Sequence, residues 1–219
     1  MALDLLIHLY YTILIILVAL SVVKYTAGIE NNYLYLNFVI IFLIECIVYF
    51  SVPVFNKNFT GLYFLLDLLN VIYVYYFFQV HFKQSKVLLF YGIASIGMIL
   101  LFNKYSFSQY SDFCGIVSCF YVITVCLTGF YLIVQNASHS TKNIQDIPFF
   151  WFGLAMLVWS IMYLFRTIPR FYFQDQDKEF MQSLRIFFAC INLLTYVVFL
   201  KLLSLYKKEW LHFYTLINQ

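Results

Sequence analysis

Charged side chains are scarce in this sequence of 219 residues. Lys, Arg, Asp and Glu make up 11% of it, whereas soluble globular domains contain about 25%. Apolar residues make up 64%, against about half in soluble domains. Such a chain cannot cover a water-facing surface, so lipid must be the solvent for most of its length. The composition excludes a water-soluble enzyme or binding domain, and the lipid bilayer is the first expected partner.

Clustered positive charge and catalytic signatures are missing too. The net charge of +3 is dispersed and forms no basic stripe, so nucleic acid is not an expected partner. The histidines form no zinc motif, and the sequence has no glycine-rich phosphate loop, nucleophile elbow or Ser-His-Asp triad. We therefore expect no cofactor, no metal and no catalytic residues. A hydrolase that uses acidic groups within the membrane stays an alternative, so enzyme activity is left open with a non-enzyme favoured.

Helix-breaking residues and paired cysteines are few. Alternating-access transporters usually interrupt helices with Gly or Pro near the membrane midplane. Here the three prolines, Pro53, Pro148 and Pro169, fall where we expect loops, which argues against transport. Most of the five cysteines lie inside apolar runs. Free Cys behaves there as a small hydrophobe, so no structural disulfide is predicted.

Long apolar runs dominate what is present. Because lipid offers no hydrogen-bond partner to backbone amides, each run must be a helix. The sequence therefore predicts an all-α, polytopic membrane protein, a bundle of seven transmembrane helices in a single domain over residues 1–219. The expected spans are residues 4–23, 34–53, 60–80, 87–102, 113–134, 149–167 and 181–204. The fourth is the shortest, slightly below the usual range of about 17–25 residues.

The first run is expected to be a retained helix, because its start is acidic at Asp4 and it is long enough to span. A cleavable signal peptide has a basic start and a shorter core. Lys and Arg, which set orientation, are nearly balanced between the two sides. Arg185 falls inside a span, and the pair Lys207-Lys208 favours the cytoplasmic side. We predict a multi-pass cell-membrane protein with its N-terminus outside and its C-terminus in the cytoplasm.

Two apolar runs each contain one carboxylate, Glu45 in the second and Asp67 in the third. A charge at the centre of a bilayer costs at least ~3 kcal/mol on insertion scales, so it normally faces protein or water. At a rise of 1.5 Å per residue, both acids lie about 10–12 Å from the same membrane surface. Two acids at one level on consecutive helices indicate a shared polar cavity.

The last run adds a polar face near that level. Gln182, Arg185, Asn192 and Tyr196 recur at helical spacing, and Arg166 ends the sixth run on the same side. We expect these side chains to turn towards the acids inside the bundle, in the outer half of the membrane. The candidate ligand-binding residues are Glu45, Asp67, Asn70, Arg185, Asn192 and Arg166.

The same residues have a structural interpretation. Buried ion pairs of Glu45 or Asp67 with Arg185 would fasten the second, third and seventh helices together. A buried pair is weak evidence of net stabilisation, although removal of one partner costs several kcal/mol. The chain would then be an accessory subunit of a larger complex.

Two short segments, Ala27–Ile29 and Arg170–Phe173, resemble segments of the seven-helix KDEL-receptor and PQ-loop families. The chain has no Pro-Gln dipeptide, and Glu45 stands where the pocket of that receptor is basic, so no function is inferred from this resemblance. The seven-span plan is also similar to the membrane halves of bacterial sensory kinases, which implies a sensing role by architecture alone.

The interpretation we favour is a sensor or receptor-like signalling module that binds a small ligand in the polar pocket. Because the compact tails contain no output domain, we expect a separate protein partner in the membrane or cytoplasm. Glu45 and Asp67 would bind a cation or hydrogen-bond donors, and Arg185 and Arg166 would balance charge or hold an acidic group. A small transporter or proton-coupled carrier is a further alternative.

Overall fold

The computed structural model describes residues 2–29, 32–55, 59–82, 85–103, 110–137, 143–173 and 177–206. Within these ranges the chain forms seven α-helices, two short 3-10 helices and no strand. The α-helices are α1 (Ala2–Thr26), α2 (Leu34–Phe55), α3 (Tyr63–His81), α4 (Lys86–Phe102), α5 (Asp112–Ala137), α6 (Pro148–Phe173) and α7 (Lys178–Leu205). The short helices η1 (Thr60–Leu62) and η2 (Ile144–Asp146) precede α3 and α6. The predicted all-α fold class is confirmed.

Helix length and composition support a multi-pass membrane protein. Among the helices of the described residues, six are long and apolar enough to cross a bilayer. Helix α4 has 17 residues, about 26 Å at 1.5 Å per residue, and is shorter than a hydrocarbon core of about 30 Å. Its large apolar side chains Val87, Phe90 and Leu101 face outward, as lipid contact allows. Lys207 and Lys208, on which the predicted orientation partly depends, lie outside the described residues.

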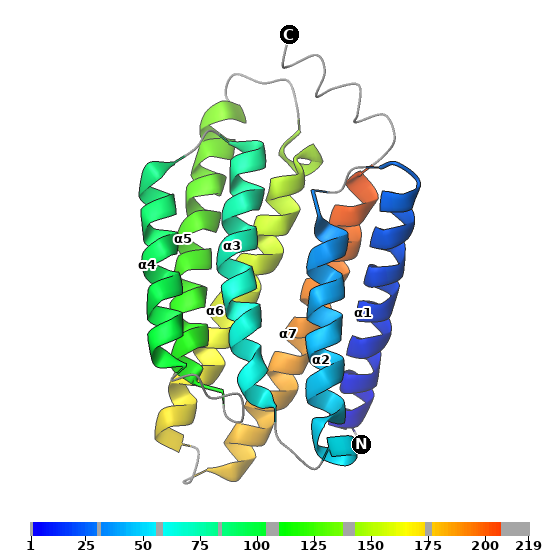
Figure 1. The fold of residues 1–219 in the computed structure, drawn as a ribbon, viewed down its shortest axis with the longest axis vertical. Helices are drawn as coiled ribbons and strands as arrows, with labels where there is room; N and C mark the ends of the chain where they lie inside the picture. Colours follow the sequence, from blue (N-terminus) through cyan, green and yellow to red (C-terminus); the bar gives the residue numbers. More distant parts are fainter. Residues whose placement is uncertain are drawn as a thin grey trace.

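The helices alternate in direction and fall into two groups (Figure 1). Helices α3, α4, α5 and α6 form one group, and α1, α2 and α7 form the other. The groups join closely where α6 packs against α7, whereas α2 and α3 make few contacts. The N-terminus lies at the end of the bundle where α2 and α6 finish and α3 and α7 begin (Figure 1). We call this the N-terminal end.

Aromatic rings fill the space between the two groups towards the opposite end. Phe77 and Phe152 stack with their ring centroids 4.2 Å apart, and Phe38 meets Phe199 edge-on at 5.3 Å. Phe152 and Phe199, 6.2 Å apart, join the groups. All four side chains are buried. We call these four residues the aromatic plug.

The end of α7 is held by a cation from α1. The Lys24 ammonium donates to the backbone carbonyls of Leu203 and Tyr206, at 2.5 and 2.9 Å. The last carbonyls of a helix carry partial negative charge, so a lysine beside them is stabilising. Gly28, at φ 75°, ends α1 in the left-handed conformation that favours glycine. The Ile29 N–H then donates to the Lys24 carbonyl at 2.9 Å, which fixes the turn beside the cation.

The prolines lie in helices, and the expectation that all three fall in loops was wrong. Pro148 is the first residue of α6, where its fixed φ suits the helix and no N–H is needed. Pro53 and Pro169 lie inside α2 and α6, close enough to the C-terminal ends that the lost backbone hydrogen bond leaves most of each helix intact. Helix α6 therefore continues past the expected end at residue 167, and Arg170 follows Arg166 by one helical turn.

Candidate functional site

A cavity of about 490 Å³ lies between the two helix groups. It is lined by side chains of α1, α2, α3, α5, α6 and α7 and of the segments just before α3 and α5. Thr60, Asp112 and Arg170 line it at the N-terminal end, and Phe199 of the aromatic plug lines it at the other. Its volume falls within the range of about 300–1,000 Å³ found for small-molecule sites.

Glu45 on α2 accepts hydrogen bonds from three tyrosine hydroxyls. Tyr10 donates to Oε1 at 2.9 Å, and Tyr63 and Tyr11 donate to Oε2 at 3.2 and 3.4 Å. Tyr10 and Tyr11 belong to α1 and Tyr63 to α3, so one carboxylate connects three helices. Because a carboxylate offers about four acceptor positions, these neutral donors satisfy most of its hydrogen-bonding capacity.

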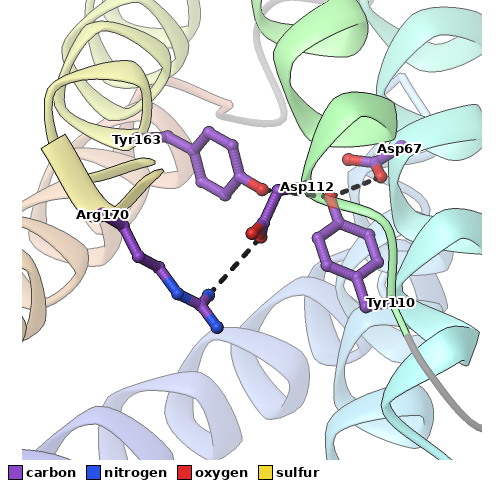
Figure 2. A network of polar contacts seen from close by, with 5 residues as sticks. All are labelled: Asp67, Tyr110, Asp112, Tyr163 and Arg170. Carbon is purple, nitrogen blue, oxygen red and sulfur yellow. Dashed lines mark hydrogen bonds and ion pairs between the residues drawn. The ribbon is translucent and has the colours of Figure 1, made fainter. Parts of the chain in front are cut away.

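Asp67 on α3 is held by a chain of two phenols (Figure 2). Tyr110 donates to Asp67 Oδ2 at 2.7 Å, and the hydroxyls of Tyr110 and Tyr163 are 3.1 Å apart. Burial raises the pKa of Tyr110, which lies between α4 and α5, so its hydroxyl stays protonated and able to donate. Gly115 on α5 makes room for this chain, because a Cβ there would overlap both hydroxyls.

Two arginines lie on one face of α6 near the N-terminal end. The Arg170 guanidinium is 3.5 Å from Asp112 Oδ1, as Figure 2 shows. Asp112 is the first residue of α5, where the helix dipole stabilises negative charge. One turn earlier, the Arg166 guanidinium lies over the Phe188 ring, 4.1 Å from its centroid, and 5.4 Å from that of Tyr163. The guanidinium of Arg166 therefore contacts aromatic rings, whereas that of Arg170 pairs with a carboxylate.

Amide side chains line the deeper part of the cavity. The indole N–H of Trp159 donates to Asn192 Oδ1 at 2.9 Å. Asn37 is 6% exposed, and its Oδ1 has no hydrogen-bond partner among the residues that the structure describes. Asn70 lines the same space. The cavity thus contains hydrogen-bonding groups at its N-terminal end and near the aromatic plug, with aromatic walls between them.

Five of the six candidate residues line this one cavity: Glu45, Asp67, Asn70, Arg166 and Asn192. Arg185 does not, and the expectation that it turns towards the acids was wrong. The buried stripe at that end of α7 runs through Met181, Leu184 and Phe188. Arg185 lies beside this stripe and is exposed. The expected ion pair is replaced by the tyrosine hydrogen bonds to both acids.

Several residues of the site were not predicted from the sequence. Asn37 is eight residues before Glu45, with Ile41 midway, so helical spacing would have placed it on the cavity face of α2. Tyr110 had no such signal, because it lies in a connection and reaches Asp67 only through tertiary structure. Trp159 would have been read as part of the apolar run.

These features define a class: a multi-pass helical membrane protein with a polar cavity between two helix groups. The described residues contain no group of three His, Cys, Asp or Glu side chains that could hold a metal ion. A scan against protein-family models and searches of curated proteins and of solved structures found nothing that matches this chain.

Proposed function

We propose that the protein is a receptor-like membrane module that binds a small ligand in the cavity and signals through a separate partner protein. Small-molecule sites are concave and mostly apolar, with a few polar groups that orient the ligand. Met156, Trp159 and Phe188 supply such walls here, and Asn37 and Asn192 supply such polar groups.

The observation that carries this proposal is the difference between the two ends of the cavity. The ion pair of Asp112 and Arg170 lies at the N-terminal end, whereas the buried rings of the aromatic plug, Phe199 among them, pack together at the other. A transporter must open its site to each side of the membrane in turn. Close ring packing at one end favours binding from one side. In the orientation we propose, that side is the cell exterior.

A ligand in the cavity would contact both helix groups. Glu45 and Asn192 belong to one group, and Asp67 and Arg166 belong to the other. Because α2 and α3 make few contacts, the separation of these two helices can depend on what lies between them, while α6 and α7 keep the groups joined. A ligand that binds one arrangement more tightly shifts the population towards it. A partner protein packed on the outward helix faces would respond to that shift.

Cysteine labelling tests access to the cavity. Asn192→Cys places a thiol on the cavity wall, whereas the native Cys190 on the same helix is exposed on the outer surface. We expect a membrane-impermeant thiol reagent to label Asn192→Cys from one side of sealed vesicles only. The protein without the introduced cysteine gives the background labelling of the native cysteines. Thr195→Cys, another cavity-lining position, repeats the test should the first variant fail to fold.

Each other outcome supports a different function. Labelling from both sides of the vesicles contradicts the receptor proposal and supports a transporter. Labelling from neither side, in both variants, supports an accessory subunit whose buried charges are structural. The labelled side also tests the orientation, since the proposal places the accessible end of the cavity at the N-terminal, extracellular side.

A further inference from the structure

Arg166 is a cavity cation whose contacts are aromatic. Its guanidinium packs on Phe188 and lies near Tyr163, and it forms no ion pair with any acid in the described part of the chain. An aromatic ring has no oxygen or nitrogen lone pair in its face to accept from the guanidinium, so the N–H groups of Arg166 stay available for another acceptor. Those groups form a fork that fits the two oxygens of a carboxylate or phosphate. Arg166 is thus positioned to receive an anionic group.

The acids of the cavity already have donors from the protein. Asp112 pairs with Arg170 at 3.5 Å, and Asp67 accepts from Tyr110. Glu45 accepts from three tyrosines. Glu45 and Asp67 have no counter-charge but do have hydrogen-bond donors, whereas the N–H groups of Arg166 have no acceptor among the described residues. This arrangement favours the acidic group that the sequence analysis gave as one expectation for Arg166 over a cation bound by Glu45 and Asp67.

Asn37 provides a second, independent indication of a ligand. Its side chain is buried, lines the cavity, and leaves Oδ1 without a partner among the described residues. A buried acceptor without a donor is unfavourable, and the Asn37 amide lines the cavity, so a polar group of a ligand there can hydrogen-bond to it. Asn37 lies on α2 near the aromatic plug, whereas Arg166 lies on α6 towards the N-terminal end. The two unsatisfied groups thus belong to opposite parts of the cavity.

The surface between these two groups is largely apolar. Met156, Trp159 and Phe199 line it, and the Trp159 N–H is already used by Asn192. Flat apolar groups pack well against such rings. A ligand that reached both Arg166 and Asn37 would therefore need an apolar or aromatic body between its polar ends.

We propose that the cavity binds an amphipathic organic anion, whose carboxylate or phosphate is held by Arg166 and whose second polar group hydrogen-bonds to the Asn37 amide. This inference rests on the proposed function and specifies its ligand class. The same chemistry has two sources, a dissolved organic acid or an anionic membrane lipid that enters between the loosely packed α2 and α3. The experiment separates them.

The first arm uses dissolved acids and the protein purified in detergent. The probes are 4-hydroxyphenyl alkanoic acids with one to five methylene groups, and their matched amides, with affinity measured by isothermal titration calorimetry. We expect at least one acid to bind about tenfold or more tightly than its amide, because charge-assisted hydrogen bonds are roughly twice as strong as neutral ones. Arg166→Gln should abolish this preference, and Arg166→Lys should reduce it. Arg185→Gln, at an exposed arginine, should preserve it.

The second arm uses lipid nanodiscs without added acid. If the anion is a lipid, the thiol of Asn192→Cys should be protected from the impermeant reagent in phosphatidylglycerol and not in phosphatidylcholine. Arg166→Gln should remove that protection. In the first arm, phenyl acids without the hydroxyl serve as a further control for Asn37. Asn37→Ala should lose any preference for a 4-hydroxyphenyl acid over its phenyl counterpart, and a preference that survives would contradict the contact with Asn37.

Two kinds of failure are distinguishable. Equal binding of acids and amides, an acid preference that survives Arg166→Gln, or no binding by acids or anionic lipid would overturn the ligand class. The receptor proposal would survive those results as long as Asn192→Cys is labelled from one side only. In phosphatidylcholine vesicles, where no anionic lipid can fill the cavity, labelling of that thiol from both sides or from neither would overturn the receptor proposal itself.

Discussion

Replacement of Tyr110 by Phe should destabilise the protein much more than replacement of Tyr63 by Phe, although each removes one hydroxyl beside a buried carboxylate. Tyr110 donates to Asp67 at 2.7 Å and also meets the Tyr163 hydroxyl at 3.1 Å. It is the side-chain donor that the described residues supply to Asp67. Glu45, by contrast, has three such donors.

The expected magnitudes follow from these contacts. A hydrogen bond to a charged group contributes about 1.5–3 kcal/mol, and a neutral one about 0.5–1.5 kcal/mol. Tyr110→Phe removes one of each and leaves a carboxyl that is 4% exposed without its donor, so we expect a loss of about 2–4 kcal/mol. Tyr63→Phe removes a 3.2 Å bond while Tyr10 and Tyr11 continue to donate to Glu45. We expect that loss to be about 1 kcal/mol.

Thermal unfolding in detergent, followed by the reaction of newly exposed cysteines with a fluorogenic thiol dye, measures the difference. A chain of this length shifts by about 2–4 °C per kcal/mol. Tyr110→Phe should therefore lower Tm by roughly 4–16 °C and Tyr63→Phe by roughly 2–4 °C. Tyr131→Phe, at a side chain 67% exposed on α5, controls for the substitution and should leave Tm unchanged. Equal shifts for the first two variants would refute the reasoning that donor number decides the loss.

Three further predictions concern single contacts. Gly115→Ala should lower Tm because its Cβ overlaps the hydroxyls of Tyr110 and Tyr163. Gly97→Ala on α4, where nothing lies within 4 Å, should leave Tm unchanged or raise it through better helix propensity. A decrease in Tm for both variants or for neither would contradict this. Arg170→Gln should change the free energy of unfolding by only about 0–1 kcal/mol, because the side chains of Arg170 and Asp112 are 41% and 21% exposed. The effect should vanish in high salt, and melting curves at two ionic strengths would show this. Lys24→Met should speed amide hydrogen exchange in the last turn of α7, measured by mass spectrometry, and leave exchange at the start of α7 unchanged.

The helices could be predicted because lipid offers the backbone no hydrogen-bond partner. Each long apolar run had to satisfy its amides internally, and the seven helices follow the seven expected runs. The end of α6 could not be predicted in this way. Pro169 is a breaker by local rules, yet α6 continues to Phe173, because one missing donor near a helix end is a small loss. Arg170 reaches the site for that reason.

The composition of the site was only partly predictable. The depths of Glu45 and Asp67 follow from counting residues along helices, and both acids line the same cavity. Their partners do not follow from counting. On a helical wheel Arg185 shares a face with Asn192, but the interior at that level is occupied by Leu184 and Phe188. Which side chain enters the interior is decided by packing between helices, and one sequence does not contain that information.

The twenty tyrosines in the sequence have a clearer role once the acids are seen with their donors. A buried carboxylate can be stabilised by a cation or by neutral hydroxyls. A buried ion pair requires the desolvation of two charges, whereas a phenol brings a donor on an otherwise apolar ring. Glu45 and Asp67 are stabilised by neutral hydroxyls, so Arg166 forms an ion pair with neither acid. The use of tyrosine to stabilise the acids is thus what leaves a cation in the cavity for a ligand, and the loss of acid selectivity in Arg166→Gln tests this connection directly.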